Sequence, residues 1–128
     1  MAGKKNLGMG LDVLLTAVEK PPRSNDNLLS KYDTLLATAV EKDDRGEFLE
    51  AYHLYCLVID MLEENVLTRH PELASLVSQA LNNAAVILFE HNFAKQAREY
   101  LEKALKMDPN NQTARENLSL ISGQGENK

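Results

Sequence analysis

The chain has 128 residues, of which 44% are hydrophobic and 26% are charged, so it can form one globular domain with a modest core. Its formal net charge of −5 argues against general nucleic-acid binding and against adsorption of the whole domain to an anionic membrane, because both require a basic surface. Cys56 is the one cysteine, which excludes an internal disulfide and a thiolate zinc cluster and leads us to expect a cytoplasmic protein.

The first segment, residues 1–26, is expected to be an N-terminal arm with a linker that contains Pro21-Pro22. Residues 4–15 read KKNLGMGLDVLL. They resemble the extreme N-terminus of chromosome-partitioning ParB proteins at Lys4, Lys5, Leu7, Gly8, Gly10, Leu11, Asp12, Leu14 and Leu15. The resemblance implies contact with a ParA-type ATPase. Met9 stands where that family has its functional arginine, and methionine cannot stabilise charge at a phosphoryl group.

The arm has a second interpretation. Leu11, Leu14, Leu15 and Val18 recur at helical spacing, so they form one apolar stripe. Such a stripe suits an amphipathic arm that packs on its own domain or on a second copy of the chain.

From residue 27 to residue 121, apolar residues recur at steps of three and four, which predicts an all-α domain without strands. Turns are expected at 43–46, at His91-Asn92 and at 108–111. We therefore expect antiparallel helices at about 27–43, 47–67, 72–90, 94–107 and 111–121. Asn25 or Asp26 is expected to cap the first of them and Asn110 or Asn111 the last. Residues 122–128 are expected to be a disordered tail.

The segment from Ala80 to Asn111 reads ALNNAAVILFEHNFAKQAREYLEKALKMDPNN. It resembles a tetratricopeptide repeat (TPR), a helix–turn–helix unit of 34 residues. The matching positions are the small residues Ala85, Ala97 and Ala104 and the closing Pro109. Small residues are required there because larger side chains would separate two closely packed helices.

An earlier unit, which contains Ala39, Gly46, Ala51 and Tyr55, resembles the family less closely, and about 12 extra residues separate the two units. The resemblance implies an antiparallel TPR array of about two repeats over residues 27–121. The helix at 111–121 would cap the array, since a final repeat otherwise exposes its apolar face. The alternative is a generic bundle of four or five helices.

The TPR resemblance also implies a concave groove that binds a peptide or a helix and is lined by the first helix of each unit. Carried over by position, the groove residues are Leu36, Val40, Gln79, Asn82, Asn83, Val86 and Phe89, with Asp33, Ala37 and Asp43 beside them. The Asn83 amide can donate and accept at once, which suits a peptide bond. The alternative is that Leu36, Val40, Val86 and Phe89 are simply core.

No motif predicts catalysis, and we expect neither a metal nor another cofactor. His53, His70 and His91 are not spaced to hold a metal from one helical face. The acidic pair Asp43-Asp44 is interpreted as a solvated surface. Three hypotheses follow: a non-enzymatic TPR adaptor that binds another protein, a homo-oligomeric scaffold that associates through the arm or an exposed repeat face, and a regulator of a ParA-type ATPase.

Overall fold

The computed structural model describes residues 24–60, 67 and 70–126 of the chain. Within these residues the regular elements are all helical, which confirms the predicted all-α class. The elements are α2 (Ser24–Asp44), α3 (Phe48–Ile59), the 3₁₀ turn η2 (Pro71–Leu73), α5 (Ala74–Glu90), α6 (Ala94–Met107) and α7 (Gln112–Glu126).

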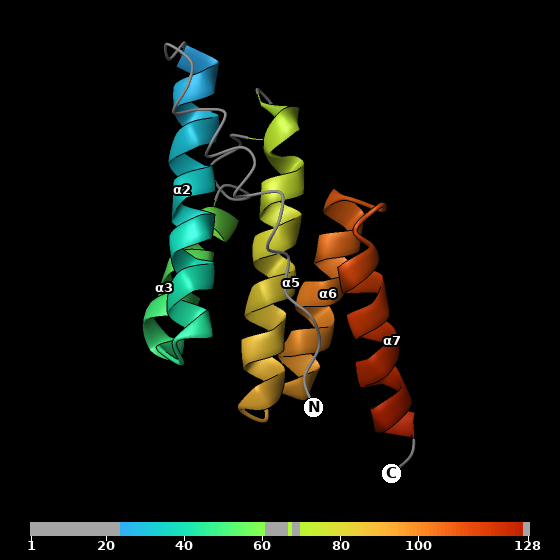
Figure 1. Cartoon of the computed structure of the whole chain (residues 1–128). Coiled ribbons are helices and arrows are strands. Elements are labelled where there is room, and N and C mark those ends of the chain that lie inside the picture. Colours follow the sequence, from blue (N-terminus) through green and yellow to red (C-terminus); the bar gives the residue numbers. More distant parts are fainter. Residues whose placement is uncertain (1–23, 61–66, 68–69, 127–128) are drawn as a thin grey trace.

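The helices pack as two neighbouring pairs followed by a single helix (Figure 1). Helix α2 packs against α3, and α5 packs against α6. The first pair meets the second where α3 and α2 contact α5, and α7 then packs on α6 and α5. Helix α5 is therefore the centre of the domain, because it contacts each of the other four α-helices in the described part of the chain.

The two pairs are closed by the same turn, repeated 46 residues later. The first turn has a hydrogen bond from the Glu47 N–H to the Lys42 carbonyl at 2.9 Å, and the second has one from Phe93 to Leu88 at 2.8 Å. The residue before each donor has a positive φ, 82° at Gly46 and 73° at Asn92. Glycine and asparagine are the residues that most readily adopt this left-handed conformation. The two turns therefore have one backbone geometry and two different sequences.

Small residues lie where the paired helices touch. Ala39 and Ala51 are fully buried in the first pair, and Ala85, Ala97 and Ala104 are fully buried in the second. Because alanine adds little side-chain volume, the helices can approach closely at these positions. The positions predicted for small residues are thus buried as expected.

Several helix boundaries differ from the prediction. Helix α2 begins at Ser24, so Asn25 and Asp26 lie in its first turn instead of preceding it. Helix α7 continues to Glu126, so residues 122–126 are helical and not a disordered tail. The predicted end of the second helix at 67 falls partly outside the described residues, since α3 is described to Ile59.

Helix α5 and the preceding turn, Pro71–Glu90, are long and apolar enough to cross a membrane by length and composition alone. The most apolar stretch of that segment is 78% buried inside the protein, as the central helix of a packed domain is. The mean hydropathy of this segment therefore follows from its place in the core.

Candidate functional site

The residues predicted to line a groove lie on α2 and α5, and the structure buries most of them. Asp33, Leu36, Val40 and Asp43 are buried on α2, whereas Ala37 is half-buried. On α5 the buried members of the predicted set are Gln79, Asn82, Asn83 and Val86, and Phe89 is half-buried. The predicted surface is thus removed from solvent, and its binding role stays a prediction.

The four apolar members of this set differ in how deeply they are buried. Leu36 and Val40 belong to the contiguous hydrophobic core, and Phe89 packs against it. Val86 is only 3% exposed and is buried with the apolar residues of the interior. The core interpretation therefore holds for Leu36, Val40 and Val86, whereas Phe89 is half-buried against the core.

Asparagine side chains connect α5 to α7. The Asn117 amide donates to the side-chain oxygen of Asn82 at 2.8 Å, and the Asn82 amide donates to that of Asn83 at 3.0 Å. All three residues are buried. Because a buried amide is costly unless it is hydrogen-bonded, this network fixes the position of α7 on α5. Asn82 and Asn83 were predicted as groove residues, whereas Asn117 was not. Asn117 follows Asn83 by 34 residues, the length of one repeat unit, and this spacing was the signal that could have identified it.

A second polar link joins the start of α7 to the centre of the domain. The Asn111 amide donates to the Ser78 hydroxyl at 2.8 Å, and Ser78 donates to the Ala104 carbonyl at 2.7 Å. The Asn111 side-chain oxygen accepts the Ala114 N–H at 3.0 Å, which confirms Asn111 as the predicted cap. This one side chain therefore both begins α7 and attaches it to α5.

Two aspartates on α2 are buried in different ways. Asp43 accepts a hydrogen bond from the Tyr55 hydroxyl at 3.0 Å, so its interpretation as a solvated surface residue was wrong. Asp33 is 0% exposed, and both of its carboxylate oxygens lack a hydrogen-bond partner. Burial raises the pKa of Asp33 to about 6. Such a carboxylate is unusual because an unpaired buried charge is strongly destabilising.

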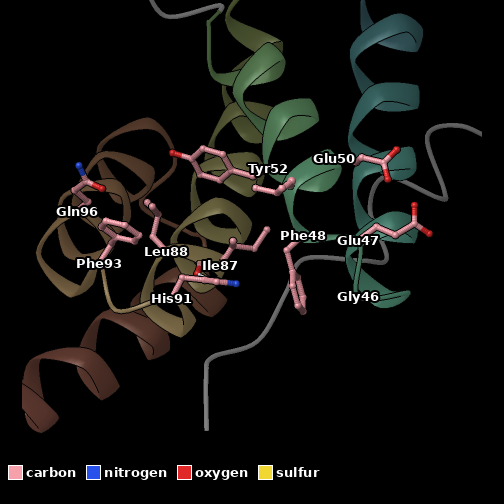
Figure 2. A pocket seen from close by; sticks show the side chains of 11 residues that line it. Gly46, Glu47, Phe48, Glu50, Tyr52, Ile87, Leu88, His91, Phe93 and Gln96 are labelled. Carbon is pink, nitrogen blue, oxygen red and sulfur yellow. Dashed lines mark hydrogen bonds between the residues drawn. The ribbon is translucent and has the colours of Figure 1, made fainter.

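An open apolar pocket of about 910 Å³ lies where the α2–α3 turn meets the α5–α6 turn (Figure 2). Its lining comes from both turns and the helices beside them: Gly46, Glu47, Phe48, Leu49, Glu50, Tyr52, Ile87, Leu88, His91, Phe93 and Gln96. Leu49 is 89% exposed and Phe93 is 53% exposed. The Phe48 and His91 rings meet edge to face, with centroids 5.3 Å apart.

Acidic side chains lie on one side of this pocket (Figure 2). The Lys42 Nζ atom lies 3.4 Å from a carboxylate oxygen of Glu47 and 3.6 Å from one of Glu50, so one cation pairs with two carboxylates. The hydrogen bond to Glu47 is the main reason that the pKa of Lys42 is raised. This pocket was not predicted from the sequence, although the large apolar residues beside both turns were a usable signal.

Among the described residues, no group of three or more histidine, cysteine or acidic side chains is placed to hold a metal ion. Burial raises the pKa of the half-buried Cys56 thiol, which makes it a poorer nucleophile at neutral pH. Tyr52 and Tyr100 approach hydroxyl to hydroxyl at 3.4 Å, and burial raises the pKa of Tyr52. The arm residues from Lys4 to Asp12 lie outside the described residues, so contact with an ATPase stays a prediction.

Comparison with known proteins adds no relative: no family model, curated protein or solved structure matches the chain.

Proposed function

We propose that the protein is a non-enzymatic interaction module of the TPR class, which binds a peptide or a helix of another protein along the face formed by α2, α5 and α7. The observation that carries the proposal is the repeated turn, with equivalent hydrogen bonds 46 residues apart. Two units of the same geometry, placed side by side and followed by one more helix, are the arrangement that a short helical array requires.

Two further features support a protein ligand. Small residues are buried at equivalent places in both units, at Ala39 and Ala85 and at Ala51 and Ala97. The same face carries the buried amides of Gln79 and Asn83. An amide side chain can accept and donate at once, so it matches the backbone of a bound peptide.

The test is affinity capture from native lysate with the full chain immobilised, comparing the natural sequence with Val86→Glu and with Leu49→Glu. Loss of a partner with Val86→Glu and its retention with Leu49→Glu would support the α2–α5–α7 face. The reverse would place binding at the open pocket instead. Circular dichroism checks that each variant folds, and Ala37→Glu provides a half-buried second position if Val86→Glu unfolds the domain.

A homo-oligomeric scaffold is the second candidate, and the exposed pocket favours it. Leu49, Phe93 and Phe48 are large apolar side chains that face solvent at one end of the domain. Clustered exposed apolar residues often mark contact surfaces between proteins. Sedimentation velocity of the full chain tests this candidate: a dimer that becomes a monomer on Leu49→Asp would support it, and a monomer at all concentrations would end it.

A further inference from the structure

The open pocket lies between the starts of two helices that belong to different pairs. Phe48 and Leu49 begin α3, and Phe93 is the residue before α6. Ile87 and Leu88, at the end of α5, lie between them (Figure 2). Three helices therefore contribute to one apolar surface that is open to solvent.

Exposed apolar side chains are concentrated at this pocket. Phe48, Leu49 and Phe93 are three of the five large apolar side chains that the described residues expose, and all three line the pocket. Their exposure lies outside the requirements of the core, because the core is formed by other, buried residues. Exposed apolar residues that gather in one place mark a contact surface, whereas single ones do not.

The charge around the pocket is negative. Glu47 and Glu50 line it, and no lysine or arginine is among the lining residues. Residues 41–50 contain five acidic and two basic side chains, a net charge of −3, whereas residues 87–96 on the other side contain one of each. Lys42 pairs with both glutamates, yet the Glu50 side chain remains 63% exposed. A cationic group can therefore approach the pocket from this side and gain favourable electrostatic energy.

We propose that the open pocket docks an amphipathic helix of another protein, with its apolar side chains against Leu49 and Phe93 and a lysine or arginine beside Glu47 and Glu50. Apolar residues at spacings of three and four give a helix one face that fits a groove, and the adjacent positions carry its charges. The described residues contain no strand, so an extended peptide finds no sheet edge among them to join.

A second copy of the chain matches the charge of the pocket less well. Two identical chains related by a two-fold axis contribute the same patch to their interface. Such a contact would bring Glu47 and Glu50 of both copies into one interface, where like charges oppose association. A basic partner removes this repulsion. The pocket is separate from the α2–α5–α7 face, so the inference goes beyond the proposed function and can fail independently of it.

The test measures the fluorescence anisotropy of a fluorescein-labelled synthetic peptide as the full chain is added. The peptide has about 15 residues, because shorter helices are unstable alone in water. It carries leucine on one face, lysine beside that face and alanine elsewhere. A second peptide has glutamate in place of every lysine, and a third has the composition of the first in scrambled order. We expect saturable binding of the lysine peptide and at least about tenfold weaker binding of the other two.

The apolar contact is tested with Leu49→Ser. This variant should bind the lysine peptide about tenfold or more weakly, because the peptide no longer buries a leucine side chain of the pocket. Leu57→Ser is the matched control, since Leu57 is an exposed leucine of the same helix outside the lining. Circular dichroism confirms that both variants fold. Equal affinities of the two variants would overturn the assignment of the peptide to the pocket.

The charged contact is tested with the double variant Glu47→Gln/Glu50→Gln. It should bind the lysine peptide roughly five- to tenfold more weakly at low salt. Its affinity should also change less than that of the natural chain between about 0.02 and about 0.3 M KCl, because fewer charge pairs are screened. Glu72→Gln/Glu102→Gln changes the net charge equally at exposed residues outside the lining and should bind like the natural chain.

Amide chemical shifts of the ¹⁵N-labelled chain locate the bound peptide. We expect the lysine peptide to shift Phe93 and Gln96 and to leave Gln79 and Asn83 on the α2–α5–α7 face unchanged. The proposal is overturned by shifts confined to that face, by equal binding of the lysine and glutamate peptides, or by no saturable binding. A dimer in sedimentation velocity that Leu49→Ser dissociates would also overturn it, because the pocket would then belong to a second copy.

Discussion

The side-chain amide of Asn117 on α7 donates to the side-chain oxygen of Asn82 on α5 at 2.8 Å, and both residues are buried. They are 35 residues apart, so the bond ties the last helix to the centre of the domain. Asn82 in turn donates to Asn83, which places three amides in one continuous buried network. The final helix is thus held by specific polar contacts as well as by apolar packing.

The first prediction concerns this link. Asn117→Ala should lower the free energy of unfolding by about 1–3 kcal/mol, because the Asn82 oxygen loses its buried donor. Urea denaturation followed by circular dichroism measures the change. Gln112→Ala on the same helix is the matched control, since Gln112 is exposed and its hydrogen bond to Glu116 is long at 3.4 Å. Equal effects of the two substitutions would show that the hydrogen bond between Asn117 and Asn82 does not stabilise the domain.

The cap of α7 gives the second prediction. Asn111→Ala removes the acceptor of the Ala114 N–H and the donor to Ser78, so we expect a loss of about 1–2 kcal/mol. Amide hydrogen exchange should accelerate at the start of α7 more than in α6. Asn110→Ala is the control, because the Asn110 side chain is exposed and makes neither contact. Unchanged exchange in the Asn111 variant would argue against its role as cap.

Asp33 gives the third prediction. Burial raises its pKa to about 6 in the folded protein from an ordinary value of 3.8, so the folded state holds this proton more tightly than the unfolded state. Stability from this group should therefore fall as the pH rises from about 4 to about 6 and stay low above that. Asp33→Asn should stabilise the protein by about 1–2 kcal/mol at pH 7.5 and have little effect near pH 4.

Thermal and urea unfolding at pH 4, 5, 6 and 7.5 measure the Asp33 contribution directly. The informative quantity is the difference between variant and natural chain at each pH, since other carboxylates titrate equally in both. Asp44→Asn is the control, because Asp44 is the exposed aspartate at the end of the same helix. A difference that does not change between pH 4 and 7.5 would show that Asp33 is not destabilised by burial.

The open pocket gives the fourth prediction. Leu49→Ser should change the free energy of unfolding by less than about 0.5 kcal/mol, because Leu49 is 89% exposed. The same substitution should reduce the fluorescence of an anilinonaphthalene dye bound to the folded chain, since Leu49 lines the pocket. Leu57→Ser, at another exposed leucine of α3 outside the lining, is the control. Equal dye signals from both variants would place the dye elsewhere.

The sequence predicted the elements whose signals are local. The helical period, the turn at Gly46 and the cap at Asn111 each depend on a few neighbouring residues, and all appear in the structure. The predicted start of α2 and the predicted end of α7 were wrong, because the residue at which a helix begins or ends depends on contacts that a local sequence pattern does not contain. The positions of Ala85 and Ala97 were predictable because helix contact itself requires small side chains there.

The site was less predictable, because burial depends on which segments meet. Asp43 and Asp44 are adjacent, yet only Asp43 faces Tyr55 on the next helix and is buried. The open pocket needs two turns that are 46 residues apart to lie together, which no local pattern specifies. Asp33 was recognised by position, but its lack of hydrogen-bond partners could only be seen in three dimensions.

The hydrogen bond between Asn117 on α7 and Asn82 on α5 joins two uncharged amides. Amides neither titrate between pH 4 and 9 nor attract counterions, and buried dipoles are screened little by salt. The attachment of the last helix should therefore keep its strength from dilute buffer to high ionic strength, whereas the Lys42 pairs with Glu47 and Glu50 beside the open pocket weaken as salt is added. The attachment of α7 and the ion pairs beside the open pocket thus differ in their sensitivity to the surrounding solution.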